Sequence, residues 1–380
     1  MTQIFDTHLI SALLRGETIT WPAATESVER EYFLMLCHFH GVTMLLYRQL
    51  EAARNRDDCP KSVLDSLRFA ARLAAARELL RRRAVEQLLN ELADRGVSPL
   101  LMKGTALAYS LYPAPELRAR ADTDLLLRKA DRAVAAKVFR ALGYEQSNSI
   151  AGDWVSSQAS WLKTDEFAVT HNFDVHWRIS NFPVFSERLT FDELWPSSLP
   201  IAKLGPHARG LGAIHALLLA CMHRLGHRQA PYYVNNVAHR DGNRLIWLYD
   251  IFLLGSTFDD SQWQTLATTA RQKGLQEVCL DGLLAAAEAF GAVAPEALLA
   301  SLRSTTNRGD VPIAGFSSSP WLWELWQIRQ VNGWRQRANL IGEHFFPAAS
   351  YVLEKYHTRH RSLLPLLYLH RAAHGLLKRL

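Results

Sequence analysis

The segment from Leu100 to Leu127 restricts the possible folds of this chain more than any other. It reads as an apolar strand, a glycine turn, a short helix and a second strand that carries Asp122 and Asp124. Because successive residues of a strand point to opposite faces, these two carboxylates share one face. Carboxylates held so close repel each other, and a hard divalent cation relieves that repulsion. The segment therefore predicts a magnesium site that handles a nucleotide.

A third acid is expected on a later strand. The stretch Phe167–Ile179 alternates between an apolar and a polar face, and Asp174 and His176 lie on the polar one. Asp174 is the natural third acid, and together the three acids can hold two metal ions. His176 is placed to contact a phosphate or to orient the acid. His171 has the opposite parity, so we interpret it as a core histidine with a hydrogen-bond partner.

The turn between the first strand and its helix is suited to phosphate. Such a junction presents backbone N–H groups and a helix N-terminus to an anion. Gly104 allows close approach, Thr105 offers a hydroxyl and Lys103 adds a point charge. Arg118 and Arg120 either pair with triphosphate oxygens or form surface ion pairs, and the sequence leaves both interpretations open.

The remaining pattern predicts an α/β (α+β) core between helical flanks. A long helix is expected from about Ser62 to Arg95, and further strands at Val97–Met102 and Ser157–Leu162. From Leu211 onward the apolar spacing is again helical. We therefore divide the chain into an N-terminal helical region (1–95), an α/β core (96–200) and a C-terminal helical region (201–380).

Composition and charge restrict the expected class of ligand and the expected cellular compartment. The 380 residues carry a formal net charge of +6, spread along the chain. This mild excess suits a nucleoside triphosphate or loose nucleic-acid contact. The four cysteines are far apart, the N-terminus does not resemble a signal peptide, and no run of about 18 apolar residues occurs. We expect a reduced, cytoplasmic protein without a membrane span.

The acidic motifs resemble those of a known family. The run Lys103-Gly104…Arg118…Asp122-Thr-Asp124-Leu-Leu-Leu, followed by Asp174-Val-His176-Trp177, resembles the uncharacterised nucleotidyltransferase family of the DNA polymerase beta-like superfamily. The resemblance implies a small mixed sheet with flanking helices. It also implies metal held by Asp122, Asp124 and Asp174, and transfer of a nucleoside monophosphate. In active members the third acid also accepts the proton of the attacking hydroxyl.

The expected activity is metal-dependent nucleotidyl transfer. A nucleoside triphosphate, ATP among the candidates, and Mg²⁺ or Mn²⁺ would react with an acceptor hydroxyl and release pyrophosphate. The sequence does not identify the acceptor, although dispersed charge favours a small molecule, peptide or protein over a long nucleic acid. Two alternatives stay open: an inactive member that binds a nucleotide or a partner, and another metal-dependent phosphotransferase or phosphodiesterase.

Three further residues stand out in the C-terminal region. His223 and His227 have the i, i+4 spacing of zinc ligands on a helix, but they lack the intervening acid of zinc proteases and Gly226 lies between them. We interpret them as ordinary helix histidines. Asp250, on an apolar helix, either lines the acceptor cleft or makes a buried hydrogen bond.

Overall fold

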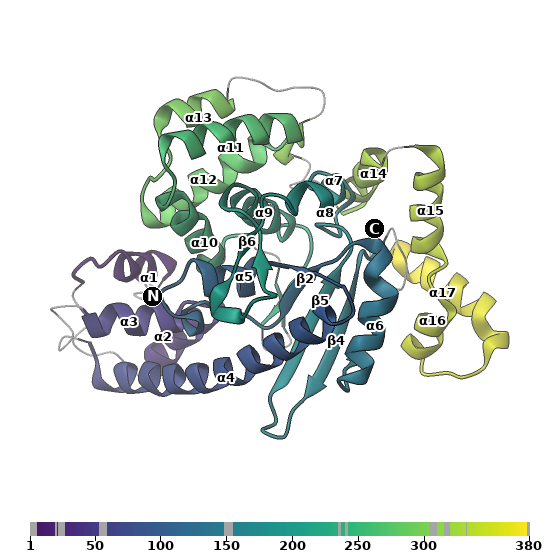
Figure 1. Cartoon of the computed structure of the whole chain (residues 1–380), viewed down its shortest axis with the longest axis horizontal. Helices are drawn as coiled ribbons and strands as arrows, with labels where there is room; N and C mark the ends of the chain where they lie inside the picture. Colours follow the sequence, from purple (N-terminus) through teal and green to yellow (C-terminus); the bar gives the residue numbers. More distant parts are fainter. Residues whose placement is uncertain are drawn as a thin grey trace.

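A seven-stranded mixed sheet forms the centre of the molecule, with helices on both sides (Figure 1). The computed structural model describes residues 6–19, 21, 27–52, 59–147, 155–234, 237–239, 242–303, 310–314, 320–331 and 333–377. Among these residues, no helix combines the length and the apolar character that a bilayer-spanning segment requires. The predicted α/β class with a mixed sheet and flanking helices is confirmed.

The sheet has the strand order β3-β4-β5-β2-β1-β7-β6. Strand β2 pairs in parallel with β5 and antiparallel with β1, while β4 and β5 form an antiparallel hairpin. A separate two-stranded sheet joins β8 to β9. The strands are β1 (Leu100–Met102), β2 (Thr123–Leu126), β3 (Glu145–Gln146), β4 (Gln158–Thr164), β5 (Thr170–His176), β6 (Leu199–Pro200), β7 (Arg209–Gly210), β8 (Tyr232–Val234) and β9 (Val237–His239).

The helices fall into three runs along the chain. The first run is α1 (Thr7–Leu14), α2 (Ser27–Phe39), α3 (Thr43–Ala52) and α4 (Lys61–Ala93). Within the sheet region lie α5 (Lys103–Ser110), α6 (Arg132–Ala141), α7 (Pro183–Ser186) and α8 (Phe191–Leu194). The last run is α9 (Ala213–Gly226), α10 (Leu245–Ser256), α11 (Asp260–Lys273), α12 (Gln276–Phe290), α13 (Glu296–Arg303), α14 (Pro320–Gln330), α15 (Trp334–Phe345), α16 (Ala349–Lys355) and α17 (Leu364–Leu377).

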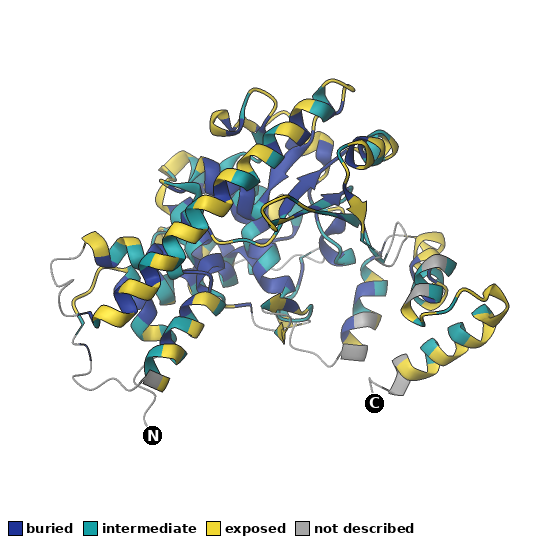
Figure 2. Cartoon of the chain, turned by 90° about the horizontal axis from the view of Figure 1, so that it is seen from below, coloured by how far each residue is buried: buried dark blue, intermediate teal, exposed yellow. Residues whose placement is uncertain are grey.

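The apolar side chains form two buried clusters. Figure 2 shows that the buried residues lie along the central sheet and the inner sides of the helices. One lies under the sheet, where the last turns of α4 pack with α6, and Phe139 stacks on Trp161 with ring centroids 5.0 Å apart. The other cluster joins α1–α3 to α9–α13. A backbone bond from the Ile246 N–H to the His40 carbonyl, at 3.1 Å, ties these two helical regions together. Helices α1–α3 and α9–α13 therefore share one core.

The hairpin strand β5 is shorter than the alternating pattern predicts. It begins at Thr170 rather than Phe167, because the preceding residues form the turn that joins β4 to β5. The Asp165 carboxylate accepts the backbone N–H groups of Phe167 and Val169, both at 2.9 Å, and Ala168 takes φ 59°. Local hydrogen bonding by an Asp side chain thus overrides a strand pattern.

Candidate active site

Asp124 and Asp174 lie side by side at the centre of the sheet. They are direct register partners on the parallel strands β2 and β5, so their side chains leave the same face. His176 follows two residues later on that face. Ligand atoms of Asp124, Asp174 and His176 all lie within 4.8 Å of one another. Strand pairing therefore brings together residues that are distant in the sequence.

Asp124 contacts two basic side chains. Its Oδ1 accepts a hydrogen bond from Lys103 Nζ at 2.6 Å and lies 2.9 Å from His176 Nε2. Burial alone would raise the pKa of Asp124, but the Lys103 charge and the His176 hydrogen bond outweigh it and hold that pKa well below its usual range. Lys103, predicted to contact phosphate, thus contacts an acid in this structure.

Asp174 is held by the neighbouring strand β4. Ser160 Oγ donates to Asp174 Oδ1 at 2.5 Å, and Gln158 Nε2 lies 3.4 Å from Oδ2. Burial, followed by the charge of Asp124, raises the pKa of Asp174. Sequence reasoning did not single out Ser160 or Gln158. The register of β4 against β5 identifies Ser160, because it stands directly opposite Asp174.

Asp122 precedes strand β2 and lies outside the 4.8 Å cluster. Burial and the charges of Asp124 and Asp174 nevertheless raise the pKa of Asp122 to about 7. Three carboxylates therefore crowd one buried region, where Lys103 contributes a single positive charge. Such a region has an excess of negative charge that a cation would neutralise.

The donor set fits a divalent cation. Carboxylate oxygens are the ligands that magnesium and manganese prefer, and imidazole is compatible with manganese. Nδ1 of His176 is buried and has no hydrogen-bond partner within the described part of the chain. Burial, followed by the Lys103 charge, lowers the pKa of His176, which keeps the imidazole neutral. Asp124 and Asp174 are the residues best placed to hold the ion, with Asp122 and His176 beside them.

The turn before α5 differs from the predicted glycine turn. The residue with positive φ is Lys103, at 49°, and Gly104 lies inside the helix that begins there. A Cβ on Gly104 would come within 3.3 Å of the Arg120 side chain, a tight contact that would require Arg120 to shift. Thr105 is fully buried, and its hydroxyl accepts a hydrogen bond from Arg120 Nε at 3.0 Å. The Thr105 hydroxyl is therefore engaged inside the protein.

The two arginines are also engaged, in buried rather than surface ion pairs. Arg118 Nη2 lies 2.6 Å from Asp250 Oδ2, and Tyr112 donates to the same carboxylate at 2.7 Å. Arg120 Nη2 lies 2.5 Å from Glu78 Oε1 on α4. Asp250, one of the residues predicted from sequence, thus makes the buried hydrogen bonds that one interpretation anticipated. Glu78 and Tyr112 carry no local sequence signal for these roles.

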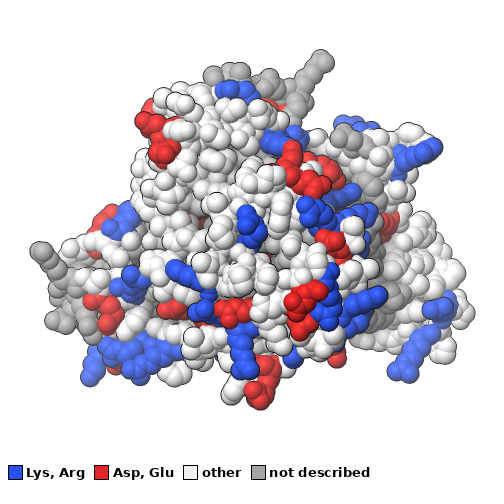
Figure 3. All heavy atoms as spheres, viewed as in Figure 1, with Lys and Arg blue, Asp and Glu red and all other residues white. Residues whose placement is uncertain are grey.

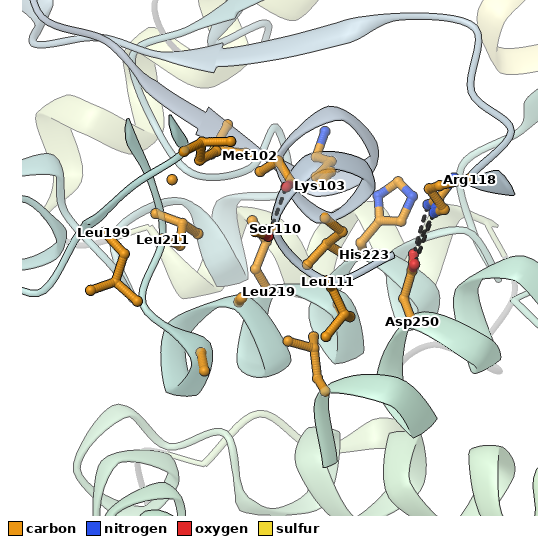
Figure 4. A pocket seen from close by; sticks show the side chains of 18 of the residues that line it. Met102, Lys103, Ser110, Leu111, Arg118, Leu199, Leu211, Leu219, His223 and Asp250 are labelled. Carbon is orange, nitrogen blue, oxygen red and sulfur yellow. Dashed lines mark hydrogen bonds and ion pairs between the residues drawn. The ribbon is translucent and has the colours of Figure 1, made fainter. Parts of the chain in front are cut away.

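A cavity of about 220 Å³ adjoins the acids through Lys103 (Figure 4). Asp250 and Arg118 lie at its edge, as does His223 of α9. The His223 ring contacts His227 edge-on, with centroids 4.5 Å apart. The only cluster of potential metal ligands among the described residues is the one at Asp124, so these two histidines do not form a second one. His171, in turn, is buried and bonded to Asp165 at 2.9 Å, as its parity predicted.

Comparison with known proteins agrees with the acidic motifs. The family described as "Uncharacterised nucleotidyltransferase" matches residues 26–291, a span that includes the sheet, the acid cluster and α9–α12. A search of curated proteins finds no match. Because the match extends over more than half of the chain, the protein belongs to the uncharacterised nucleotidyltransferase family.

Proposed function

We propose that this protein is a metal-dependent nucleotidyltransferase that transfers a nucleoside monophosphate from a nucleoside triphosphate to an acceptor hydroxyl and releases pyrophosphate. The observation that carries the proposal is the pairing of Asp124 with Asp174 on adjacent parallel strands, with Asp122 nearby. Family membership supports the reaction class. We propose that the reaction takes place in the cytoplasm, and the four buried, unpaired cysteines are compatible with that setting.

We propose that Asp122, Asp124 and Asp174 hold Mg²⁺ or Mn²⁺. The bound ion would neutralise triphosphate charge and acidify the attacking hydroxyl. Lys103 keeps Asp124 ionised, and His176 fixes the orientation of that carboxylate. Asp174 is positioned by Ser160 and takes the proton of the acceptor hydroxyl. Helix α5 begins directly after Met102, the register partner of Asp124, and we propose that the backbone N–H groups at its N-terminus bind the triphosphate.

The acceptor belongs to the small-molecule, peptide or protein classes. On the face drawn in Figure 3, basic side chains are interspersed with acidic and uncharged ones and do not form a continuous track. A long nucleic acid requires several phosphate contacts along such a track.

The metal assignment is tested by Asp124→Asn. We expect calorimetry to show magnesium-dependent triphosphate binding by the wild-type protein, weakened about 10- to 100-fold in the variant, because a charged ligand is lost. Asp192→Asn is the matched control, since Asp192 is 81% exposed and its ion pair among the described residues is with Arg128 at the surface. Equal binding by the wild type and Asp124→Asn would refute the metal site.

The reaction class is tested by its products. Incubation with magnesium and each nucleoside triphosphate in turn should release pyrophosphate and leave a labelled monophosphate on the acceptor. Formation of the nucleoside diphosphate with the γ-phosphate on the acceptor would indicate a phosphotransferase instead, and orthophosphate would indicate hydrolysis. Magnesium-dependent binding with no product from any triphosphate would favour a binding protein without catalysis.

A further inference from the structure

Small side chains create the cavity beside the acid cluster. It is enclosed by α5, β6, β7, α9 and α10, and its volume is about 220 Å³. Three of these elements line the cavity with small residues, which leave its volume unfilled. They are Ala106, Gly210, Ala213, Ala216 and Ala220. For scale, an engineered apolar cavity of roughly 150 Å³ holds benzene. The space is therefore sufficient for a group somewhat larger than one aromatic ring.

The wall of the cavity is apolar at one end and polar at the other. Figure 4 shows Leu199 and Leu211 at one end of the cavity, and Lys103, His223 and Arg118 toward the opposite end. The Lys103 ammonium that borders the cavity is the one that contacts Asp124. A ligand with an apolar body would thus direct its polar end toward the acid cluster.

Most polar groups of the wall already have partners inside the protein. Arg118 is paired with Asp250, while the hydroxyls of Ser110 and Thr257 donate to carbonyls of their own helices at 2.8 and 2.7 Å. These groups satisfy one another, so they do not require a polar ligand.

His223 differs from the other polar residues of the wall. Its ring lies edge-on to His227 and to Trp247, with centroids 4.5 and 4.9 Å apart, and its nitrogens make no hydrogen bond within the described residues. Burial, with the charges of His227 and Lys103, lowers the pKa of His223 well below its ordinary value. A neutral imidazole offers one donor and one acceptor, which suits a hydroxyl.

We propose that this cavity binds the acceptor of the transfer reaction, an alcohol whose apolar body of one or two rings fills the cavity. Its hydroxyl lies at the Lys103 end, where His223 meets it on one side and the acids that take its proton lie on the other. This inference rests on the proposed function. A nucleobase is a poorer occupant, because its several ring nitrogens and exocyclic groups would be buried against apolar walls without partners.

Binding of indole-3-ethanol to the full chain, measured by calorimetry without metal or nucleotide, tests the proposal. We expect saturable binding about three- to tenfold tighter than that of 3-ethylindole, which lacks the hydroxyl. His223→Phe keeps an aromatic ring at this position but removes the imidazole nitrogens. It should therefore abolish the difference in affinity between the two probes. Failure of both probes to bind at millimolar concentration, or a difference that survives His223→Phe, overturns the proposal.

Filling the cavity provides the matched pair of variants. Ala220→Leu should weaken indole-3-ethanol binding by about tenfold or more, whereas Ala300→Leu, on an exposed position of α13, should leave it unchanged. Thermal unfolding checks that each variant folds. If Ala220→Leu does not fold, Ala216→Val takes its place. Unchanged binding in the filled variant overturns the proposal. So does saturable binding of adenosine that Ala220→Leu abolishes, because the cavity would then hold the base.

Magnesium–triphosphate binding by the same variants separates this inference from the proposed function. Ala220→Leu should bind the triphosphate as the wild type does, and Asp124→Asn should still bind indole-3-ethanol. If Asp124→Asn retains triphosphate binding while the cavity variants behave as expected, the metal site fails and the apolar alcohol site stands. If Asp124→Asn loses triphosphate binding but the cavity variants leave indole-3-ethanol binding unchanged, the proposed function stands and the acceptor binds elsewhere.

Discussion

Asp122 and Asp124 are separated by a single residue, yet their pKa values shift in opposite directions. Asp124 is buried and Asp122 is half-buried, and burial by itself raises the pKa of each. Asp124 gains Lys103 and His176 as direct partners, whereas Asp122 chiefly experiences the repulsion of Asp124 and Asp174. The difference between the two pKa values therefore depends on which carboxylate contacts Lys103.

The raised pKa of Asp122 predicts a pH-dependent stability. Because the folded-state pKa is about 7 and the unfolded value is about 3.9, the native protein holds this proton more tightly than the unfolded chain. Its contribution therefore becomes unfavourable as pH rises from about 4 to about 7. In metal-free buffer, Asp122→Asn should gain stability relative to the wild type, by up to a few kcal/mol, on going from pH 4.5 to pH 8.

Urea unfolding of both proteins at the two pH values measures this gain. Added magnesium should reduce it, because a bound cation stabilises the ionised carboxylates. A stability difference between Asp122→Asn and the wild type that is the same at both pH values would contradict the prediction.

Between elements, a buried polar network runs from the segment after α5 to helix α10. Arg118 and Asp250 are separated by 132 residues, and their side chains are 6% and 5% exposed. Tyr112 adds a third member to the network. Because these charges are buried, each depends on the other for compensation. The network connects the acid-bearing sheet to the helices that enclose the cavity.

Arg118→Met should therefore destabilise the protein by about 3–5 kcal/mol, since it leaves the Asp250 carboxylate buried without its partner. Arg303→Met is the control. Its partner Glu296 is 76% exposed, and surface pairs of this kind contribute less than about 1 kcal/mol. Denaturant unfolding of both variants gives the comparison. If the double variant Arg118→Met/Asp250→Leu is no more stable than Arg118→Met, the two residues do not act as a pair.

At the scale of the whole molecule, the three regions distinguished by sequence are joined by shared cores. The last turns of α4, from the N-terminal region, supply Val85, Leu88, Leu89 and Leu92 to the cluster under the sheet. The remaining N-terminal helices share their cluster with α9–α13. We retain the division into 1–95, 96–200 and 201–380 as a proposal about sequence regions.

These contacts predict that residues 96–380 alone do not fold cooperatively, because the sheet would lose the apolar face that α4 covers. A chain ending at residue 332 is the control. It lacks α15–α17, whose residues are mostly exposed or half-buried, and it should still unfold in one cooperative transition. Calorimetric melting compares the two. Cooperative melting of residues 96–380 at the wild-type temperature would contradict the prediction.

Local periodicity predicted the parts of the site that depend on one strand at a time. A period of two residues placed Asp174 and His176 on one face and His171 on the other, and the burial of His171 with Asp165 agrees. Periodicity did not predict the turn at Asp165–Ala168, because a side chain there competes for backbone hydrogen bonds. It also did not predict Ser160, whose position depends on strand register.

The sequence by itself determined the α/β class, the acid-bearing strands and the face on which each acid lies, because these follow from spacing along the chain. Only the tertiary structure decided that β5 pairs with β2, that Lys103 contacts Asp124, and that Arg118 and Arg120 are paired with Asp250 and Glu78. It alone defined the apolar cavity at His223. These features join residues far apart in sequence, and their positions are set by the packing of whole elements rather than by local pattern.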